Sequence, residues 1–217
     1  MIPLYHDFSD ETVLVFGGGP VGARKARRFA EEARVVVVSP AFADRAFGDA
    51  ELVREAPDAE GVRGWVARVG PALVVAATDD PDLNAAAAAA ARAAGALVNR
   101  ADRSGSDRDV DSVVVPATVE DGSVSVAIST GGASPALAKH LREQIEADIA
   151  DAGAMAELTA DLRSELKTRD MTAEERRDAV RAVVRSPSVW KGLRRGESKA
   201  RREAQRVIRN TVGGDSS

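Results

Sequence analysis

The sequence contains no cysteine among its 217 residues. That absence excludes disulfide bonds, thiolate metal sites and cysteine nucleophiles, and it agrees with a reducing cytoplasm, the location that we expect. Histidine is scarce as well, because the chain has two, His6 and His140, in unrelated places. Without thiolates or a histidine cluster, the sequence offers no recognisable set of metal ligands. We therefore expect no dedicated metal site.

The sequence also lacks a long apolar run and a basic leader. The alanine run near residue 85 is interrupted by Arg92 and is typical of a helix rather than a membrane span. The first residues include Asp7, Asp10 and Glu11, which do not fit a signal peptide. The formal net charge is -4, so the charge of the whole chain does not favour nucleic acid. We expect neither a membrane nor a nucleic-acid partner.

A glycine cluster lies between an apolar run at residues 12–16 and a helical pattern at residues 21–33. Within it, Gly17, Gly19 and Gly22 match G-x-G-x-x-G. The first glycine permits a tight turn, the second lets the backbone approach a pyrophosphate, and the third lets the helix pack closely on the strand. Free N–H groups and the dipole at the helix start favour phosphate there. Because strand and helix patterns flank the motif, a dinucleotide site is favoured over a purely structural glycine turn.

The apolar runs that follow predict a parallel sheet. Further strands are expected at residues 34–39, 51–54, 73–77 and 97–99, and a further helix at residues 82–94. Asp79 or Asp80 is placed to cap that helix, and Gly95 ends it. Residues 43–64 predict irregular structure apart from the short strand. This alternation is typical of a doubly wound, Rossmann-like α/β sheet, in which ligands bind at the carboxyl ends of the strands.

The second strand ends without the acidic residue that commonly holds the ribose of NAD. Ser39, Pro40 and Ala41 stand there instead, so the ribose has to be held by a hydroxyl or by backbone groups. No acid repels the extra phosphate of NADP, and no arginine follows at once to attract it. The choice between NAD and NADP therefore stays open at this level.

The pattern changes after residue 111. Residues 112–117 and 123–128 are rich in β-formers and flank an Asp-Gly turn, which predicts a hairpin. A loop of small residues leads from there into a helix expected at residues 136–150, with Ser134 as its N-cap. The tail predicts helices with a break near residues 186–188. We expect three regions, namely a Rossmann domain at 1–111, a hairpin and helix at 112–150, and a helical domain at 151–217.

Four segments in this order resemble the precorrin-2 dehydrogenase family, the dehydrogenase and ferrochelatase of siroheme synthesis. They are the glycine turn at residues 15–26, the run at residues 74–80, Val98 and Asn99 with Asp102, and the Gly-Gly-x-Ser-Pro loop with its helix at residues 126–143. The resemblance implies NAD-dependent oxidation of precorrin-2 to sirohydrochlorin. It also implies insertion of Fe(II) in many members, and homodimers built through the hairpin and the following helix.

The resemblance assigns residues as well. It implies that the essential aspartate of the family falls on Asp102, and that NAD contacts fall in the glycine turn and after the second strand. We expect the cofactor to contact Gly17, Gly19, Pro20, Val21, Gly22, Ser39, Pro40, Ala41 and Thr78, and the substrate to contact Thr130, Gly131, Gly132 and Ser134. Residues 103–111 are a polar insertion relative to the family. If the alignment slips there, Asp79 or Asp80 becomes the rival carboxylate.

Other functions are compatible with parts of the sequence. A Rossmann module that senses NAD without catalysis would share the glycine turn, but no winged-helix pattern precedes the fold and the basic tail has no clear recognition helix. A dehydrogenase for another small substrate would not explain the loop at residues 129–135. A family member without chelatase activity stays equally open.

Overall fold

The computed structural model describes residues 2–103 and 112–212. The chain divides into two compact units, Met1–Val115 and Pro116–Ser217, so the hairpin and the C-terminal helices fall in one unit. The polar insertion expected at 103–111, apart from Arg103, and the end of the tail beyond residue 212 lie outside the described residues. Among the described residues, no helix has the length and apolar character needed to cross a membrane.

The first unit contains a five-stranded sheet whose neighbouring strands are all parallel. Its strands are β1 (Thr12–Phe16), β2 (Arg34–Ser39), β3 (Glu51–Arg54), β4 (Leu73–Ala76) and β5 (Leu97–Arg100), in the order β3-β2-β1-β4-β5. In β1, Val15 is paired with Val37 on one side and Val75 on the other. The strand order steps outward from β1 in both directions, which is the doubly wound arrangement that the sequence predicts.

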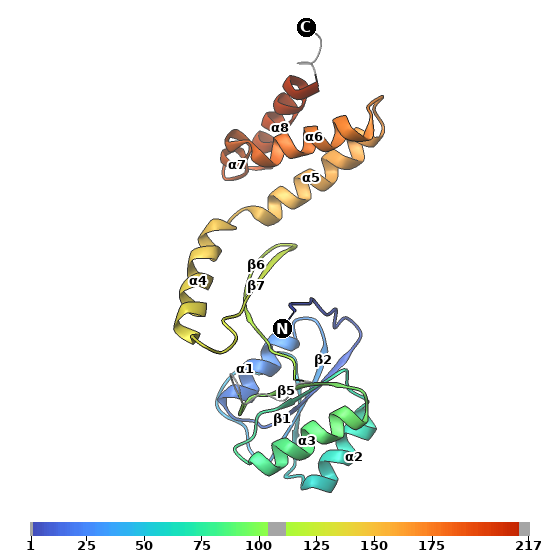
Figure 1. Ribbon diagram of the computed structural model, residues 1–217, viewed down its shortest axis with the longest axis vertical. Coiled ribbons are helices and arrows are strands. Elements are labelled where there is room, and N and C mark those ends of the chain that lie inside the picture. The colour runs from blue at the N-terminus through green and yellow to red at the C-terminus, as the bar shows by residue number, and fades with distance from the viewer. Residues whose placement is uncertain (1, 104–111, 213–217) are drawn as a thin grey trace. The chain divides into compact units, whose positions relative to one another are not determined.

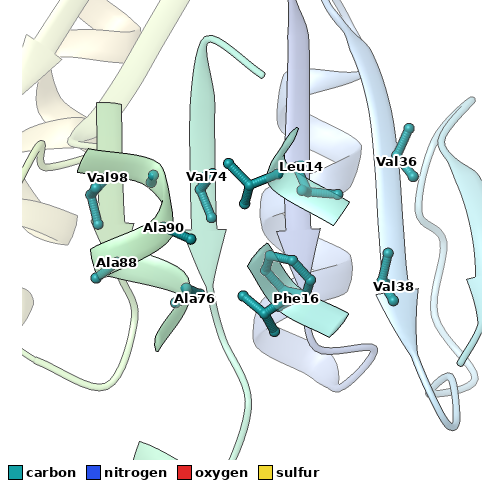
Figure 2. Packing of buried hydrophobic residues seen from close by; sticks show 13 residues of the cluster. Leu14, Phe16, Val36, Val38, Val74, Ala76, Ala88, Ala90 and Val98 are labelled. Atoms are coloured by element: carbon teal, nitrogen blue, oxygen red, sulfur yellow. The ribbon is translucent and has the colours of Figure 1, made fainter. Parts of the chain in front are cut away.

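Alternate residues of the central strands face opposite layers of helices. Leu14, Phe16 and their neighbours in the sheet pack on α2 (Ala59–Val69) and α3 (Pro81–Ala93), as Figure 2 shows. Val13 and Val15 pack on the other face, against α1 (Pro20–Phe29). Figure 1 shows α2 and α3 side by side. Burial on both faces explains why these strands are continuous apolar runs in the sequence.

The helix α2 corrects the expectation of irregular structure at residues 43–64. Asp58 caps it, because its carboxylate accepts hydrogen bonds from the backbone N–H groups of Glu60 and Gly61. Val62 and Val66, one helical turn apart, are buried against the sheet. Tertiary packing of this short stripe therefore outweighs the weak helix propensity of its glycines.

The second unit begins with an antiparallel hairpin, β6 (Ala117–Asp121) and β7 (Val124–Ile128), and continues with α4 (Pro135–Asp148). The hairpin is shorter than predicted, since Ser112 instead forms a parallel bridge with Val98 of β5 and Val113 donates a backbone hydrogen bond to the same residue. The predicted cap of α4 is confirmed, because Ser134 Oγ accepts a hydrogen bond from the N–H of Leu137.

The rest of the second unit is helical, as predicted. Its helices are α5 (Ala152–Lys167), α6 (Ala173–Arg185), α7 (Pro187–Leu193) and α8 (Glu197–Val212). Leu158 and Leu162 of α5, Val183 of α6 and Ile208 of α8 belong to one buried cluster. The expected break falls between α6 and α7, where Pro187 cannot donate a backbone hydrogen bond.

Candidate active site

The glycine turn after β1 brings the backbone of three segments into close approach. Gly17 has a φ of +113°, and a Cβ there would lie 2.3 Å from the carbonyl oxygen of Ala77 at the end of β4. A Cβ on Gly22 would lie 1.9 Å from the carbonyl oxygen of Gly17. These two glycines are therefore required for the packing of β1, α1 and β4.

Gly19 differs, since a Cβ there would meet nothing within 4 Å. It is the N-cap of α1 and provides no side-chain cap, and Pro20 follows as the first helical residue. No side chain caps the backbone N–H groups of the first turn of α1, and the space beside Gly19 is open. This arrangement fits a pyrophosphate, as the glycine motif predicts.

Gly18 was not singled out by the motif, yet the structure leaves no room for a side chain there. A Cβ on Gly18 would lie 2.2 Å from the carbonyl oxygen of Ala41. The turn after β2 thus packs directly on the glycine turn after β1. In a dinucleotide-binding fold these are the segments that meet the ribose and the pyrophosphate.

The residues after β2 are arranged by their own contacts. The hydroxyl of Ser39 donates a hydrogen bond to the carbonyl of Ala41 at 2.8 Å, so its proton is used within the turn. Arg54, paired with Ser39 in the sheet register, donates to the carbonyl of Pro40 at 3.1 Å. Sequence reasoning missed this arginine because strand pairing, not chain order, brings it to the turn. Backbone groups are therefore the better candidates for holding the ribose.

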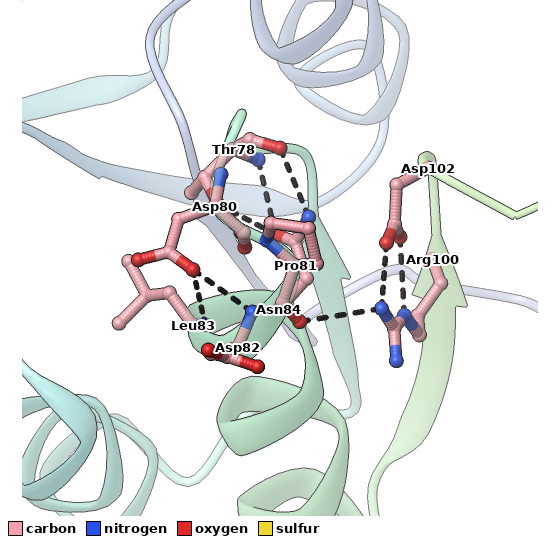
Figure 3. A network of polar contacts seen from close by, with 8 residues as sticks. All are labelled: Thr78, Asp80, Pro81, Asp82, Leu83, Asn84, Arg100 and Asp102. Carbon is pink, nitrogen blue, oxygen red and sulfur yellow. Dashed lines mark hydrogen bonds and ion pairs between the residues drawn. The ribbon is translucent and has the colours of Figure 1, made fainter.

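Asp102 follows the end of β5 and is held by an arginine from that strand. Figure 3 shows both carboxylate oxygens facing the Arg100 guanidinium, with Nε at 3.1 Å from Oδ1 and Nη2 at 2.6 Å from Oδ2. The Arg100 side chain is 4% exposed and the Asp102 side chain 25%. Hydrogen bonds from Arg100 lower the pKa of the Asp102 carboxyl below its usual value, so it is ionised at neutral pH.

The adjoining strand end is organised by Asn84, a buried residue of α3. Its amide accepts a hydrogen bond from the backbone N–H of Thr78 and donates one to the Thr78 carbonyl, at 3.1 and 2.9 Å. The Thr78 hydroxyl lies 2.8 Å from Asn84 Oδ1, within the network of Figure 3. Arg100 reaches the same region through a 3.5 Å hydrogen bond to the carbonyl of Pro81. The ends of β4 and β5 are thus joined by polar contacts, and Asn84 was not predicted.

The rival carboxylates occupy different settings. Asp80 is the N-cap of α3, with its Oδ1 accepting from the N–H groups of Asp82 and Leu83 at 2.8 and 3.1 Å. Asp79 is exposed. Asp102 is also exposed as a whole residue, but its side chain is 25% exposed, it is paired with Arg100, and its carboxyl pKa is lowered. These differences favour Asp102 as the functional carboxylate.

The predicted substrate loop lies in the second unit. Thr130 Oγ1 is 3.1 Å from the Ser134 carbonyl and accepts from the Ser134 N–H at 3.3 Å. Gly131 and Gly132 have φ values of +65° and +89°, which favour glycine. The loop residues are thus close to one another. The glycine turn, Ser39, Thr78 and Asp102 form a separate group in the first unit. Among the described residues, no group of three or more histidine or acidic side chains is arranged to hold a metal.

The glycine turn, the parallel sheet and the ionised carboxylate at the strand ends define a dinucleotide-binding protein of the Rossmann class. A family model described as putative NAD(P)-binding matches residues 4–117, and one described as sirohaem biosynthesis protein central matches residues 121–148. The precorrin-2 dehydrogenase of Methanosarcina barkeri is 35% identical over 95% of this chain and 93% of its own length. The chain belongs to the precorrin-2 dehydrogenase family.

Two further comparisons define how far the similarity extends. The siroheme synthase of Pseudomonas putida is 35% identical over 95% of this chain, but the match spans 44% of that longer protein. The solved structure of SirC, a precorrin-2 dehydrogenase, superimposes with a TM-score of 0.66 and 23% identity over 95% of this chain and 98% of that one. The predicted fold class, family and NAD-dependent oxidoreductase activity are confirmed. The residue assignments and the three-region division stay predictions.

Proposed function

We propose that this chain oxidises precorrin-2 to sirohydrochlorin at the strand ends where Asp102 lies, with NAD as the oxidant. The observation that carries the assignment is the Asp102–Arg100 pair. It keeps a carboxylate ionised at the end of β5, in the same sheet whose strand β1 leads into the glycine turn. In parallel sheets this edge is where ligands bind. Family membership supplies the reaction, and the pair supplies a charged group suited to it.

The reaction removes a hydride and a proton from precorrin-2 and yields sirohydrochlorin, NADH and H⁺. Bound NAD supplies the hydride acceptor. Loss of a hydride leaves positive charge on the macrocycle, and an ionised carboxylate stabilises such charge as it develops. Because Arg100 lowers the pKa of Asp102, this carboxylate is a weak base. We therefore assign it first to positioning and charge stabilisation, and second to receiving the departing proton.

The chain's own groups position the cofactor in this proposal. N–H groups at the start of α1 bind the pyrophosphate, with Gly19 leaving the space for it. Backbone groups after Ser39, at Pro40 and Ala41, hold the ribose. Thr78, fixed by Asn84, forms the wall between the ends of β4 and β5. The loop with Thr130, Gly131, Gly132 and Ser134 contacts the substrate.

A homodimer formed through the hairpin and α4 is the second part of the proposal. None of the residues of α4 is buried in the single chain, and Leu137 is 47% exposed. A two-stranded hairpin has little stability by itself. The exposed Leu137 of α4 and the half-buried valines of β7 support pairing with a second copy.

The test is an anaerobic assay of purified protein with precorrin-2 and NAD, followed by the absorbance of sirohydrochlorin and NADH together. We expect equal amounts of both, and Asp102→Ala to lower the rate about 100-fold or more. Asp79→Ala, the exposed rival, is the matched control and keeps the rate. Full turnover by Asp102→Ala would remove Asp102 from the mechanism. NAD binding without product would instead support a sensing module. Adding Fe(II) afterwards tests whether the chain also makes siroheme.

A further inference from the structure

A small pocket flanks Asp102 in the first unit, and apart from Arg100 its side chains have no part in the reaction proposed above. Its volume is about 210 Å³, and its walls come from α1, the end of β5 and residues 112–115. Among the described residues that line it, the charged ones are all basic: Arg24, Lys25, Arg100 and Arg103. Ala101 and Arg103, the neighbours of Asp102 in the chain, are both in the wall. The pocket is thus an electropositive recess beside the candidate active carboxylate.

Lys25 is a desolvated cation in this wall. Burial, together with repulsion from Arg24 and Arg28, lowers the pKa of its ammonium to about 8. No described carboxylate lies within ion-pair distance of Lys25. Removing a cation from water without a counterion is unfavourable. An anion that enters the pocket would reverse that cost.

Two uncharged groups in the same wall also lack partners. Asn99 is 6% exposed, and its amide nitrogen donates to the carbonyl of Val113 at 2.8 Å, which fixes the orientation of the amide. Asn99 Oδ1 and Ser112 Oγ are buried with no hydrogen-bond partner. Buried polar atoms without partners are uncommon and costly in folded proteins. A hydroxyl donor and an amide acceptor are therefore held ready in a basic pocket.

We propose that this pocket binds one carboxylate side chain of the tetrapyrrole, with Lys25 as its counterion and the Ser112 hydroxyl as a hydrogen-bond donor. The inference rests on the proposed function and deepens it. An ammonium has three protons, so Lys25 can bond the ligand and Asn99 Oδ1 together. A carboxylate fits better than a phosphate of NAD, because the start of α1 at Gly19 already offers the phosphate site. Anchoring one arm beside Asp102 fixes which ring carbon faces that carboxylate.

Binding of a carboxylate should be coupled to proton uptake. The charged groups around Lys25 are Arg24 and Arg28 on its own helix and Arg100 and Arg103 at the end of β5, where Asp102 is bound to Arg100. Residues 112–115 contribute no titratable side chain. In the free protein Lys25 is partly neutral at pH 8 to 9, around a pKa of about 8. A bound anion raises that pKa, so the complex takes up a proton in this range.

The experiment uses the full chain with sirohydrochlorin as probe, in parallel with NADH. The variants are Lys25→Met and Ser112→Ala, and the matched control is Lys199→Met, which removes an exposed lysine of α8. We expect Lys25→Met to weaken sirohydrochlorin binding about tenfold or more, and Ser112→Ala about threefold, with NADH affinity unchanged. Calorimetry in two buffers of different ionisation enthalpy should detect proton uptake by the wild type and by Lys199→Met, and none by Lys25→Met.

Three results would overturn the inference. One is sirohydrochlorin affinity in Lys25→Met and Ser112→Ala equal to that of the wild type. Another is a loss confined to NADH, which would give the pocket to the cofactor. The third is proton uptake retained by Lys25→Met. Turnover is measured separately with precorrin-2 and NAD. If the wild type turns over precorrin-2 and the variants bind sirohydrochlorin as tightly as the wild type, the inference about the pocket is wrong and the proposed activity stands. If the wild type binds sirohydrochlorin but does not turn over precorrin-2, the proposed activity is wrong and the inference is still tested by binding.

Discussion

The sheet of the first unit and the hairpin with α4 in the second differ in how much of themselves they bury. β1 and β2 bury every residue but the first. β6 and β7 each bury a single residue, Val119 and Ile128, and α4 buries none. The edge strand β3 buries no residue, so it is the central strands that complete their core within one chain. In the hairpin and α4, Leu137 is exposed and other apolar side chains are only half-buried, which indicates that this segment is shaped for a further partner.

This difference in burial is local and does not apply to the whole of each unit. The helices α5 to α8 also form a core of their own, in which Leu162, Leu166 and Val183 are almost completely buried. The uncovered part of the second unit is thus confined to the hairpin and α4. That segment also contains the glycine loop for which we propose substrate contact. Assembly and substrate binding would then depend on the same segment.

A matched pair of leucine truncations tests the comparison most strongly. Leu14 is fully buried in β1, and Leu137 is 47% exposed on α4. Leu14→Ala should lower the free energy of unfolding of the first unit by about 3 to 5 kcal/mol, because it leaves a cavity. Leu137→Ala should lower that of the dissociated chain by less than about 1 kcal/mol. Urea denaturation at low protein concentration measures both. Equal losses would contradict the comparison.

The second prediction concerns the partner of α4. Leu137→Arg places a charge on the apolar face that we propose to lie at the dimer interface, and it should weaken self-association about 100-fold, equivalent to about 3 kcal/mol. Helix content should not change, because Leu137 is exposed in the single chain and is not part of its buried core. Sedimentation over a range of concentrations measures the equilibrium.

The control for that experiment is Glu146→Gln, at an exposed position nine residues after Leu137 and therefore on the opposite face of the same helix. It shifts the net charge by the same amount away from the proposed interface, loses only a surface ion pair with Arg142, and should leave the dimer intact. A wild-type chain that is monomeric at all concentrations would refute the proposed homodimer directly.

The third prediction separates the glycines of the turn. Gly19→Ala meets no atom within 4 Å, so the protein should fold normally. The added methyl group occupies the space proposed for the pyrophosphate, and the affinity for NADH should fall about tenfold. Gly64→Ala in α2, which also meets nothing within 4 Å, is the control and should keep full affinity. Unchanged NADH affinity in Gly19→Ala would move the phosphate site elsewhere.

The sequence predicted the sheet well because its strands are continuous apolar runs and its glycine motif has fixed spacing. It missed α2, whose signal is weakened by Gly61 and Gly64 and whose buried stripe consists of Val62 and Val66. It also assigned residues 112–117 wholly to the hairpin. The residues around Ser112 favour a β conformation whether it belongs to the hairpin or lies beside β5. Only its pairing with Val98 shows that it lies beside β5.

For the site, the sequence located the groups that share one segment. Asp102 and the glycine turn were found, whereas Arg54 and Asn84 were not. Arg54 contacts Pro40 because β3 pairs with β2 in a register that places it opposite Ser39. Asn84 contacts Thr78 because the first turns of α3 lie next to the end of β4. Lys25 stood inside a recognised motif, yet its place in one pocket wall with residues 112–115 depends on how these distant segments pack. Contacts between distant segments are what a single sequence leaves out.

The last prediction concerns Arg100, which connects Asp102 to the buried strand β5. Its hydrogen bonds lower the carboxyl pKa, so the ionised form persists above that lowered pKa and is lost only as the pH falls through it. Arg100→Met removes the guanidinium while burial still acts on the carboxyl, so the pKa of Asp102 should rise. The acid limb of kcat/KM should then move to higher pH, with about a tenfold loss per pH unit below it. Arg63→Met, at an exposed position of α2, should leave the profile unchanged. An acid limb that does not move in Arg100→Met would mean that the ionisation of Asp102 does not control the rate, and the carboxylate would then be tied to the structure of the strand end rather than to the reaction.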